Sequence, residues 1–254
     1  MFIARSPVPG PRSPVPFFAA LIDMLFPPLC HLCKAFIPDA GDVHLCSGCL
    51  ENNSRLSSPL CIVCGAPFFT EEGIDHLCSG CSTAPPHFTA ARAAMLFEGT
   101  VKELIHRFKY DKKVQLRRPL GILAAQGLST FASAASPDLV IPVPLHVKRL
   151  KERGFNQAVL LGEVLAGHWR LPLSRDNLRR TRWTEPQINL SVAERTSNVR
   201  GAFGIKSPCA VKGKRIILVD DVYTTGSTVA ECAKTLKQSG AEKVFVVTVA
   251  RAVR

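Results

Sequence analysis

The sequence predicts an α/β protein in which helices flank a parallel β-sheet and a small cysteine-rich module comes first. Eight of the ten cysteines form four CxxC pairs before residue 82. Residues 215–250 have the pattern strand, polar loop, helix and strand, which is typical of a right-handed crossover between parallel strands. Hydrophobic residues make up 46% and charged residues 20% of the 254, a composition typical of a folded globular chain.

Three segments are expected: a tail with a short helix at 1–29, the cysteine module at 30–90, and the α/β domain at 91–254. Four prolines in residues 1–14 favour a frayed tail. The apolar stretch Phe17–Phe26 contains Asp23 and lacks the features of a signal peptide, so it is interpreted as an amphipathic helix. No apolar run reaches the ~18 residues of a membrane helix. We therefore expect no membrane insertion.

The positive charge lies in the second half of the chain. Residues 1–90 hold 4 Lys and Arg against 7 Asp and Glu, a balance of −3, whereas residues 91–254 hold 28 against 13, a balance of +15. The two values sum to the +12 of the whole chain. A basic domain favours polyanionic partners or phosphorylated ligands, and a merely solubilising surface is the alternative.

The four CxxC pairs form an internal repeat of about 31 residues, since the gaps between paired motifs are 12 and 13 residues. One CxxC turn directs two sulfurs at one ion, and two turns complete a tetrahedral thiolate site. Zinc ligation would supply folding free energy of about 10 kcal/mol per site to a module with little apolar sequence. The predicted ligands are Cys30, Cys33, Cys46 and Cys49 for one Zn²⁺, and Cys61, Cys64, Cys78 and Cys81 for a second.

Other arrangements of these cysteines stay open at this point. A cross-braced pairing has the same composition, and a nearby His31, His44 or His76 can replace a thiolate. A redox role is less favoured because no βαβ pattern surrounds a CxxC pair. A four-thiolate site has no open coordination position, so the module is predicted to be structural or a binding surface.

The α/β domain is expected to begin with a strand at Ala93–Phe97. Val101, Leu104, Ile105 and Phe108 then recur at helical spacing, which places Lys109 and its basic neighbours on or near the opposite, solvated face. The remaining expected elements are a helix at 116–134, a strand at 138–143, a helix from 154 to about 166, a segment at 176–181, a polar loop to residue 189, and a short helix from 191 to 195.

The residues that follow the strand Arg215–Val219 carry the strongest chemical pattern. Asp220 and Asp221 end this strand, a Thr- and Ser-rich loop follows, and a helix runs from Val229 to Gln238. Gly226 permits close backbone approach, and the helix N-terminus offers N–H groups to a phosphate. The aspartates can accept hydrogen bonds from ribose hydroxyls and help to hold Mg²⁺ through the ligand or water. The hydroxyl-bearing loop residues are Thr224, Thr225, Ser227 and Thr228.

Several segments resemble known motifs. Residues 217–228 (ILVDDVYTTGST) are similar to the 5-phosphoribosyl-1-pyrophosphate (PRPP) signature of type I phosphoribosyltransferases, and Ile141–His146 resembles their pyrophosphate-binding strand and loop. Arg153–Gln157, Asn198–Phe203 and Leu25–Cys30 add a narrower likeness. Together they resemble the ComF/ComFC competence family, also described as GntX-like, over nearly the whole chain from about residue 20.

The resemblance implies a type I phosphoribosyltransferase fold with an N-terminal double zinc ribbon, in a cytoplasmic factor of DNA uptake and natural transformation. It implies that Asp220 and Asp221 meet the ribose and its Mg²⁺, and that Thr224, Thr225, Gly226, Ser227 and Thr228 bind the 5-phosphate. The implied pyrophosphate loop holds Leu145 and His146 with Lys148 and Arg149 nearby. A hood over the site would include Arg179, Arg180 and Gln187.

No catalytic residue or acceptor follows from the motif, so turnover is left open. The favoured hypothesis is a transformation factor that binds PRPP or a nucleotide-like ligand and handles single-stranded DNA, with other DNA-uptake proteins as further partners. Phe108, Tyr110 and Phe155 lie among basic residues and could stack on bases, or belong to the core. The alternatives are an active phosphoribosyltransferase of nucleotide salvage or biosynthesis, and a regulator that senses PRPP.

Overall fold

The computed structural model describes the chain except for residues 1–25, 39–40, 69, 71–72, 184–191 and 254. Most of the expected helix at 17–26, the predicted ligand residue Gln187 and the start of the expected helix at Ser191 lie outside the described residues. In the part that is described, no helix has the length and apolar character needed to cross a membrane.

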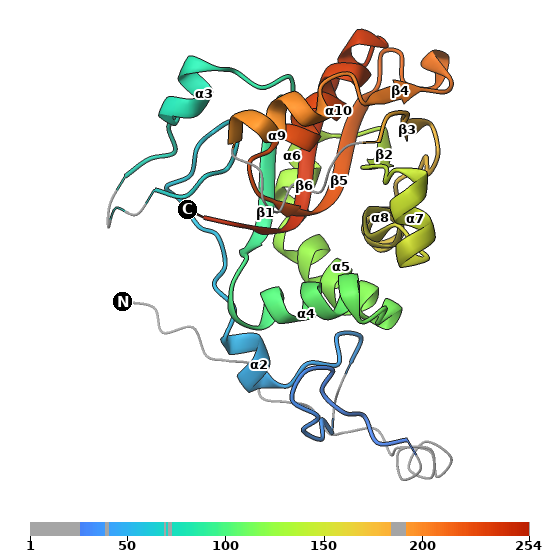
Figure 1. The fold of residues 1–254 in the computed structure, drawn as a ribbon. Helices are drawn as coiled ribbons and strands as arrows, with labels where there is room; N and C mark the ends of the chain where they lie inside the picture. The colour runs from blue at the N-terminus through green and yellow to red at the C-terminus, as the bar shows by residue number, and fades with distance from the viewer. Residues whose placement is uncertain (1–25, 39–40, 69, 71–72, 184–191, 254) are drawn as a thin grey trace.

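A parallel four-stranded sheet forms the centre of the molecule, with the strand order β1-β6-β5-β2 (Figure 1). Its strands are β1 (Ala90–Leu96), β2 (Leu139–Pro142), β5 (Arg215–Tyr223) and β6 (Lys243–Arg251). The predicted crossover is confirmed, since β5 and β6 pair in parallel around an intervening helix. The expected α/β class is therefore correct.

Side chains of β5 alternate between two apolar layers, as the two-residue period of a strand requires. Ile217 and Val219 pack with α4 (Gly99–Tyr110), α5 (Arg117–Gly127) and α8 (Gln157–Trp169). Ile216 and Leu218 pack on the other face with α10 (Ser227–Gln238) and residues near α9 (Val192–Val199). The sheet is thus covered on both faces, as parallel sheets usually are.

Two expectations about the elements need correction. The single helix expected at 116–134 is broken at Leu128 into α5 and α6 (Ser129–Ala135), after a 3₁₀ turn η1 at Val114–Leu116. The aspartates do not follow β5 but lie inside it, because the strand continues to Tyr223. The polar residues of this extension remain in the sheet because their backbone pairs with β6, with Asp220 opposite Thr248 and Tyr223 opposite Arg251.

Shorter elements connect the layers. Helix α7 spans Val147–Arg153, and a small antiparallel pair is formed by β3 (Leu178–Arg180) and β4 (Phe203–Ile205). A 3₁₀ turn, η3, spans Pro208–Ala210. Helix α9 extends to Val199, four residues beyond the end expected from the sequence.

The cysteine module wraps the outside of this domain as two ribbons (Figure 1). The first ribbon (30–49) ends in the short helix α2 (Ser47–Glu51) and lies beside α4, whereas the second (61–81) ends in α3 (Ser79–Thr83) and lies beside β1 and β6. The chain between them runs along the edge of the sheet, where Arg55 forms a bridge with Met95.

Candidate functional site

A cavity of about 410 Å³ opens at the carboxyl ends of β2 and β5. The two strands are neighbours, but α8 follows β2 on one face of the sheet and α10 follows β5 on the other. Adjacent strands whose connections leave in opposite directions create a crevice, which is where open α/β sheets bind ligands. Strand β2 ends at Pro142, opposite Val219, so β5 projects beyond it and forms the floor of the cavity.

The loop between β5 and α10 forms one end of this cavity and is shaped for a phosphate. Gly226 caps α10 at φ +77°, and a Cβ there would lie 2.2 Å from the Tyr223 hydroxyl. Only glycine combines this backbone with such close contact. The Thr225 and Ser227 hydroxyl oxygens are 2.9 Å apart beside the N-terminus of the 12-residue helix α10. Hydroxyls and helix N–H groups thus face the same end of the cavity.

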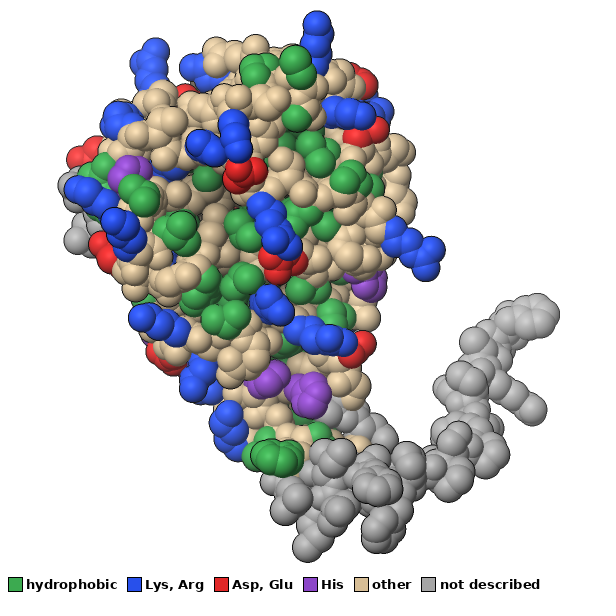
Figure 2. All heavy atoms as spheres, turned by 90° about the vertical axis from the view of Figure 1, so that its right-hand side faces the viewer, with side chains coloured by type: hydrophobic (Ala, Val, Ile, Leu, Met, Phe, Trp, Pro, Cys, Tyr) green, Lys and Arg blue, Asp and Glu red, His purple; other side chains and the backbone are tan. Residues whose placement is uncertain are grey.

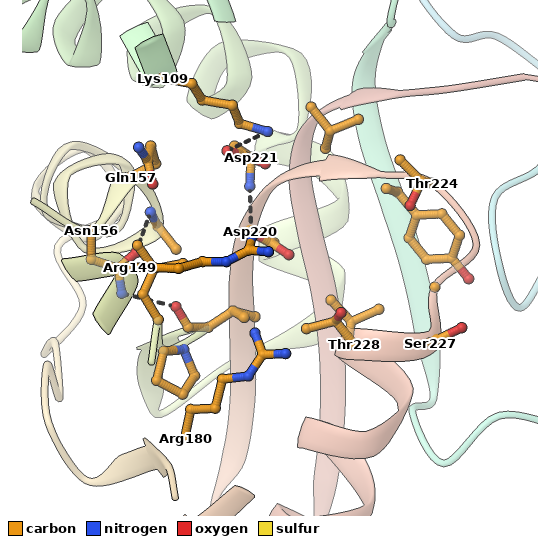
Figure 3. A pocket seen from close by; sticks show the side chains of 18 of the residues that line it. Lys109, Arg149, Asn156, Gln157, Arg180, Asp220, Asp221, Thr224, Ser227 and Thr228 are labelled. Atoms are coloured by element: carbon orange, nitrogen blue, oxygen red, sulfur yellow. Dashed lines mark hydrogen bonds and ion pairs between the residues drawn. The ribbon is translucent and has the colours of Figure 1, made fainter. Parts of the chain in front are cut away.

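The aspartate pair lies at the centre of the cavity and is partly neutralised by a lysine from α4. Lys109 Nζ is 2.9 Å from Asp221 Oδ2, and both side chains are largely buried (Figure 3). Asp220 Oδ1 accepts a hydrogen bond of 2.9 Å from the Asp221 backbone N–H. Burial, together with the Asp221 charge, raises the pKa of Asp220 to about 7.

Arginines line the side of the cavity that faces the cradle and the aspartates (Figure 3). Arg153 donates to Gln157 Oε1 at 3.1 Å and lies 5.6 Å above the Tyr110 ring. Arg149 comes from α7, and Arg180 comes from β3, where burial lowers its pKa. The cavity therefore combines a hydroxyl-rich cradle, a carboxylate pair and cationic walls, which suits a phosphorylated ligand with free hydroxyls.

The structure brings most of the predicted ligand-site residues together around this one cavity. The predicted residues that line it are Asp220, Asp221, Thr224, Thr225, Gly226, Ser227, Thr228, Leu145, Arg149 and Arg180.

Three other predicted residues do not line the cavity. His146 caps α7 by accepting from the Lys148 backbone N–H at 3.3 Å. The Lys148 ammonium lies 5.3 Å from the centre of the Trp183 ring. Arg179, which precedes the cavity residue Arg180 in a strand, points to the other side and pairs with Asp176 at 3.5 Å.

Six polar or aromatic residues that line the cavity are not among the predicted site residues. Asn156 caps α8 by accepting from the Ala158 N–H and donates to the Val143 carbonyl, so it ties the end of β2 to α8. The buried Gln157 side chain has an Nε2 without a hydrogen-bond partner among the described residues. For Arg153, Asn156 and Gln157, the signal in the sequence is that residues 153–157 resemble a motif of the family. The six residues are Lys109, Tyr110, Arg153, Asn156, Gln157 and Tyr223.

The eight paired cysteines form two separate clusters, each drawn from one repeat. Within each cluster the four sulfurs lie within 4.8 Å of one another. Zn–S bonds of about 2.3 Å in a tetrahedron place sulfurs about 3.8 Å apart, so both donor sets fit zinc. The pairing within each repeat is therefore confirmed, and neither cluster contains a histidine. Both fit structural zinc sites.

Crowding of four thiols shifts their pKa values in opposite directions within each cluster. Burial raises the pKa of Cys30 and of Cys61, but backbone N–H groups outweigh it and lower each to about 6. Burial and three neighbouring thiols raise the pKa of Cys49 to about 12. A thiolate is thus already favoured at one position in each cluster, and a bound Zn²⁺ would favour it at the others.

The second ribbon reaches the back of the phosphate cradle. Arg251 donates from Nη1 to the Cys64 carbonyl at 2.7 Å, and its guanidinium lies 4.3 Å from the centre of the Tyr223 ring. The same Tyr223 ring packs under Gly226. Cys64, Arg251, Tyr223 and Gly226 therefore form a continuous contact from one metal cluster to the cradle.

Basic side chains are spread over the face that carries α5, α7 and α8. Figure 2 shows many Lys and Arg side chains on the face turned to the viewer, with fewer acidic ones between them. Of the aromatic residues considered for base stacking, Phe108 is fully buried and belongs to the core, whereas Tyr110 is 53% exposed at the edge of the cavity. Phe155 packs against Phe108.

Comparison with known families finds two matches in this chain. Residues 21–82 match the double zinc ribbon domain, and residues 160–253 match the phosphoribosyl transferase domain.

Curated relatives match over most of the chain. The DNA utilization protein YhgH of Shigella flexneri is 33% identical over 224 residues, which cover 87% of this chain and 95% of that protein. Competence protein F of Haemophilus influenzae is 36% identical over 153 residues, covering 59% of this chain and 67% of that one. Competence protein ComFC of Bacillus subtilis is 29% identical over 204 residues, covering 78% and 80%.

Among solved structures, the glutamine PRPP amidotransferase of B. subtilis, in complex with ADP and GMP, is 26% identical, with a TM-score of 0.36. The match covers 52% of this chain and 26% of that one.

Proposed function

This chain belongs to the ComF/ComFC competence family, and we propose from that premise that it acts in DNA uptake and utilization by binding a phosphorylated pentose, PRPP or a nucleotide, in the cavity of its phosphoribosyltransferase domain. Single-stranded DNA in the cytoplasm is the proposed macromolecular partner. Other DNA-uptake proteins are proposed as further partners.

One observation carries the ligand proposal: the phosphate cradle, the aspartate pair and the arginines face the same cavity. A 5-phosphate at the α10 N-terminus would place a ribose ring over β5, where the buried carboxylates accept hydrogen bonds from its hydroxyls. Arg149 and Arg180 then face groups carried beyond the ribose. A domain balance of +15 supports the DNA proposal because phosphate neutralisation dominates non-specific nucleic-acid binding.

Mg²⁺ enters this proposal with the ligand rather than with the protein. The diphosphate of PRPP chelates Mg²⁺ by itself, and protein sites for this ion commonly add only one or two carboxylates to the phosphate oxygens. The zinc clusters take no part in ligand chemistry, since four thiolates leave the metal no open position.

Binding and transformation should fail together when the aspartate pair is removed. We would titrate PRPP with Mg²⁺ by calorimetry into the wild type and Asp220→Ala/Asp221→Ala, and score transformation frequency for the same alleles in a naturally transformable host. Asp176→Ala, an exposed acid outside the cavity, is the matched control. Circular dichroism verifies that each variant is folded.

The expected result is loss of PRPP binding and of transformation in the double variant, with both retained in the control. Normal transformation without PRPP binding would contradict the proposal and direct attention to the basic surface. Pyrophosphate release in the presence of a defined base would instead support an active phosphoribosyltransferase.

A further inference from the structure

The Lys109 ammonium contacts the carboxylate oxygen of Asp221 that a metal ion bound to the aspartate pair would use as a ligand. The ammonium is 2.9 Å from Asp221 Oδ2, and the Lys109 side chain is 19% exposed. The other carboxylate, Asp220, already accepts the Asp221 N–H through Oδ1. Mg²⁺ demands near-ideal octahedral geometry and gives up water reluctantly. The pair as arranged therefore fits a resident ammonium better than a directly coordinated Mg²⁺.

The position of Lys109 is fixed by the helix that carries it. The preceding residue, Phe108, is fully buried against the sheet. At the other end of α4, Gly99 adopts φ +50°, where a Cβ would lie 2.6 Å from the Asn52 carbonyl. The Val101 N–H donates to Asn53 Oδ1 at 3.1 Å. Lys109 thus extends from a helix that is packed and anchored at both ends, which fixes the position of its ammonium.

The net charge of the side chains that line the cavity indicates the charge of the ligand that would neutralise it. The described lining holds four cationic side chains and two carboxylates, so the difference is +2 when both carboxylates are ionised. A phosphate monoester carries about −1.5 to −2 at neutral pH, which matches that difference without any divalent cation. The cationic residues counted are Lys109, Arg149, Arg153 and Arg180.

We propose that Lys109 is the resident counter-cation of the aspartate pair, and that the cavity consequently binds a nucleoside 5′-monophosphate without a divalent metal ion. This inference rests on the proposed function, because it assumes that the cradle holds the 5-phosphate. The ammonium pairs with Asp221 Oδ2 and holds that side chain in place, so the carboxylates can accept hydrogen bonds from the ribose hydroxyls. Lys109 acts here as a positioning residue.

The test is a titration of AMP into the zinc-loaded, full-length protein, with and without Mg²⁺. Magnesium is omitted rather than chelated, so that the cysteine clusters keep their metal. Lys109→Met removes the charge and keeps most of the stem, and Lys109→Arg restores a charge. The matched control is Lys102→Met, an exposed lysine on the first turn of the same helix that does not line the cavity. Thermal unfolding verifies that each variant is folded.

Wild type and Lys102→Met should bind AMP with affinities that change less than about threefold when Mg²⁺ is added. Lys109→Met should lose about tenfold or more without Mg²⁺, which corresponds to about 1.4 kcal/mol. Mg²⁺ should restore part of that loss, because the released Asp221 carboxylate can then face a cation. Lys109→Arg should retain most of the wild-type affinity.

Two results would overturn the inference: a wild type that needs Mg²⁺ to bind AMP, or a Lys109→Met variant that binds like the wild type in its absence. A wild type that binds PRPP with Mg²⁺ but not AMP also overturns it, while leaving the proposed function intact. A wild type that binds neither ligand overturns both.

Discussion

The two zinc ribbons share one local structure but differ in what they face. In each, the first cysteine donates its N–H to the residue five positions on, Cys30 to Ala35 at 2.8 Å and Cys61 to Ala66 at 2.7 Å. The residue after each first CxxC has positive φ, 65° in the first ribbon and 71° in the second. The residue at this position is Lys34 in the first ribbon and Gly65 in the second.

The choice follows from the surroundings of each turn. Lys34 is exposed, so its side chain has space even though the left-handed conformation is costly for it. A Cβ at Gly65 would lie 2.5 Å from the Ala91 carbonyl, because the second ribbon is docked on β1 through the Ala91 N–H to Val63 carbonyl bond of 2.7 Å. The first repeat is therefore docked on α4, with Cys30 and Leu45 in the buried core, whereas the second is part of the wall behind the ligand cavity.

Both ribbons contact elements that line the cavity, but the second ribbon lies closer to the phosphate cradle than the first. The first contacts α4, where Arg107 donates to the carbonyls of His31 and Leu32 at 3.4 and 3.3 Å. That helix is also held by its own buried apolar face. The second ribbon reaches the cradle directly, since Arg251 contacts both Cys64 and Tyr223. We expect the cradle to depend more on the second ribbon than on the first.

The largest expected difference comes from removing the metal ligands of one ribbon at a time. Cys64→Ser/Cys81→Ser should release one zinc and weaken PRPP binding by about tenfold or more, because the cradle loses its support, equivalent to about 1.4 kcal/mol. Cys33→Ser/Cys46→Ser should release one zinc and leave the affinity nearly unchanged. Metal content and calorimetry on both variants provide the measurement. Equal losses of affinity would contradict the comparison.

The two turn residues provide a second and smaller contrast. Gly65→Ala should lower the free energy of unfolding by about 2–4 kcal/mol, since it combines a left-handed alanine with a clash against β1. Lys34→Gly should be neutral or raise it slightly, because it relieves the left-handed lysine without opening a packed contact. Chemical denaturation measures both. A neutral Gly65→Ala would show that the second ribbon is not docked as described.

The smallest contrast concerns the arginines that join each ribbon to the domain. Arg251→Met should cost about 1–2 kcal/mol, because it leaves the Cys64 carbonyl without its charged donor. Arg107→Met should cost less, since its hydrogen bonds to the first ribbon are 3.3–3.4 Å long and its partner Glu103 is half exposed. PRPP titration should show a weaker affinity only for Arg251→Met. Identical affinities in the two variants would be the contrary result.

Local sequence was sufficient wherever the participating residues are close in the chain. The cysteine clusters could be predicted because each CxxC turn and its partner lie in one repeat, so the metal closes a short loop. The cradle Thr224–Thr228 could be placed at a helix N-terminus because its strand, loop and helix are consecutive. The choice between pairing within a repeat and cross-braced pairing needed the structure, since both use the same residues.

The α/β class, the two thiolate sets and a phosphate cradle beside two aspartates could all be inferred from the sequence. The contact of Lys109, expected on a solvated face, with Asp221 depends on packing between distant segments. The same packing leaves His146 and Lys148 outside the cavity lining. Asp220 and Asp221 belong to β5 because Thr248 and Ala250 of β6 lie opposite Asp220 and Val222 and continue the pairing past them. Periodicity and spacing indicate which side chains share a face of one helix or strand. Pairing between side chains depends on which other segment packs against that face.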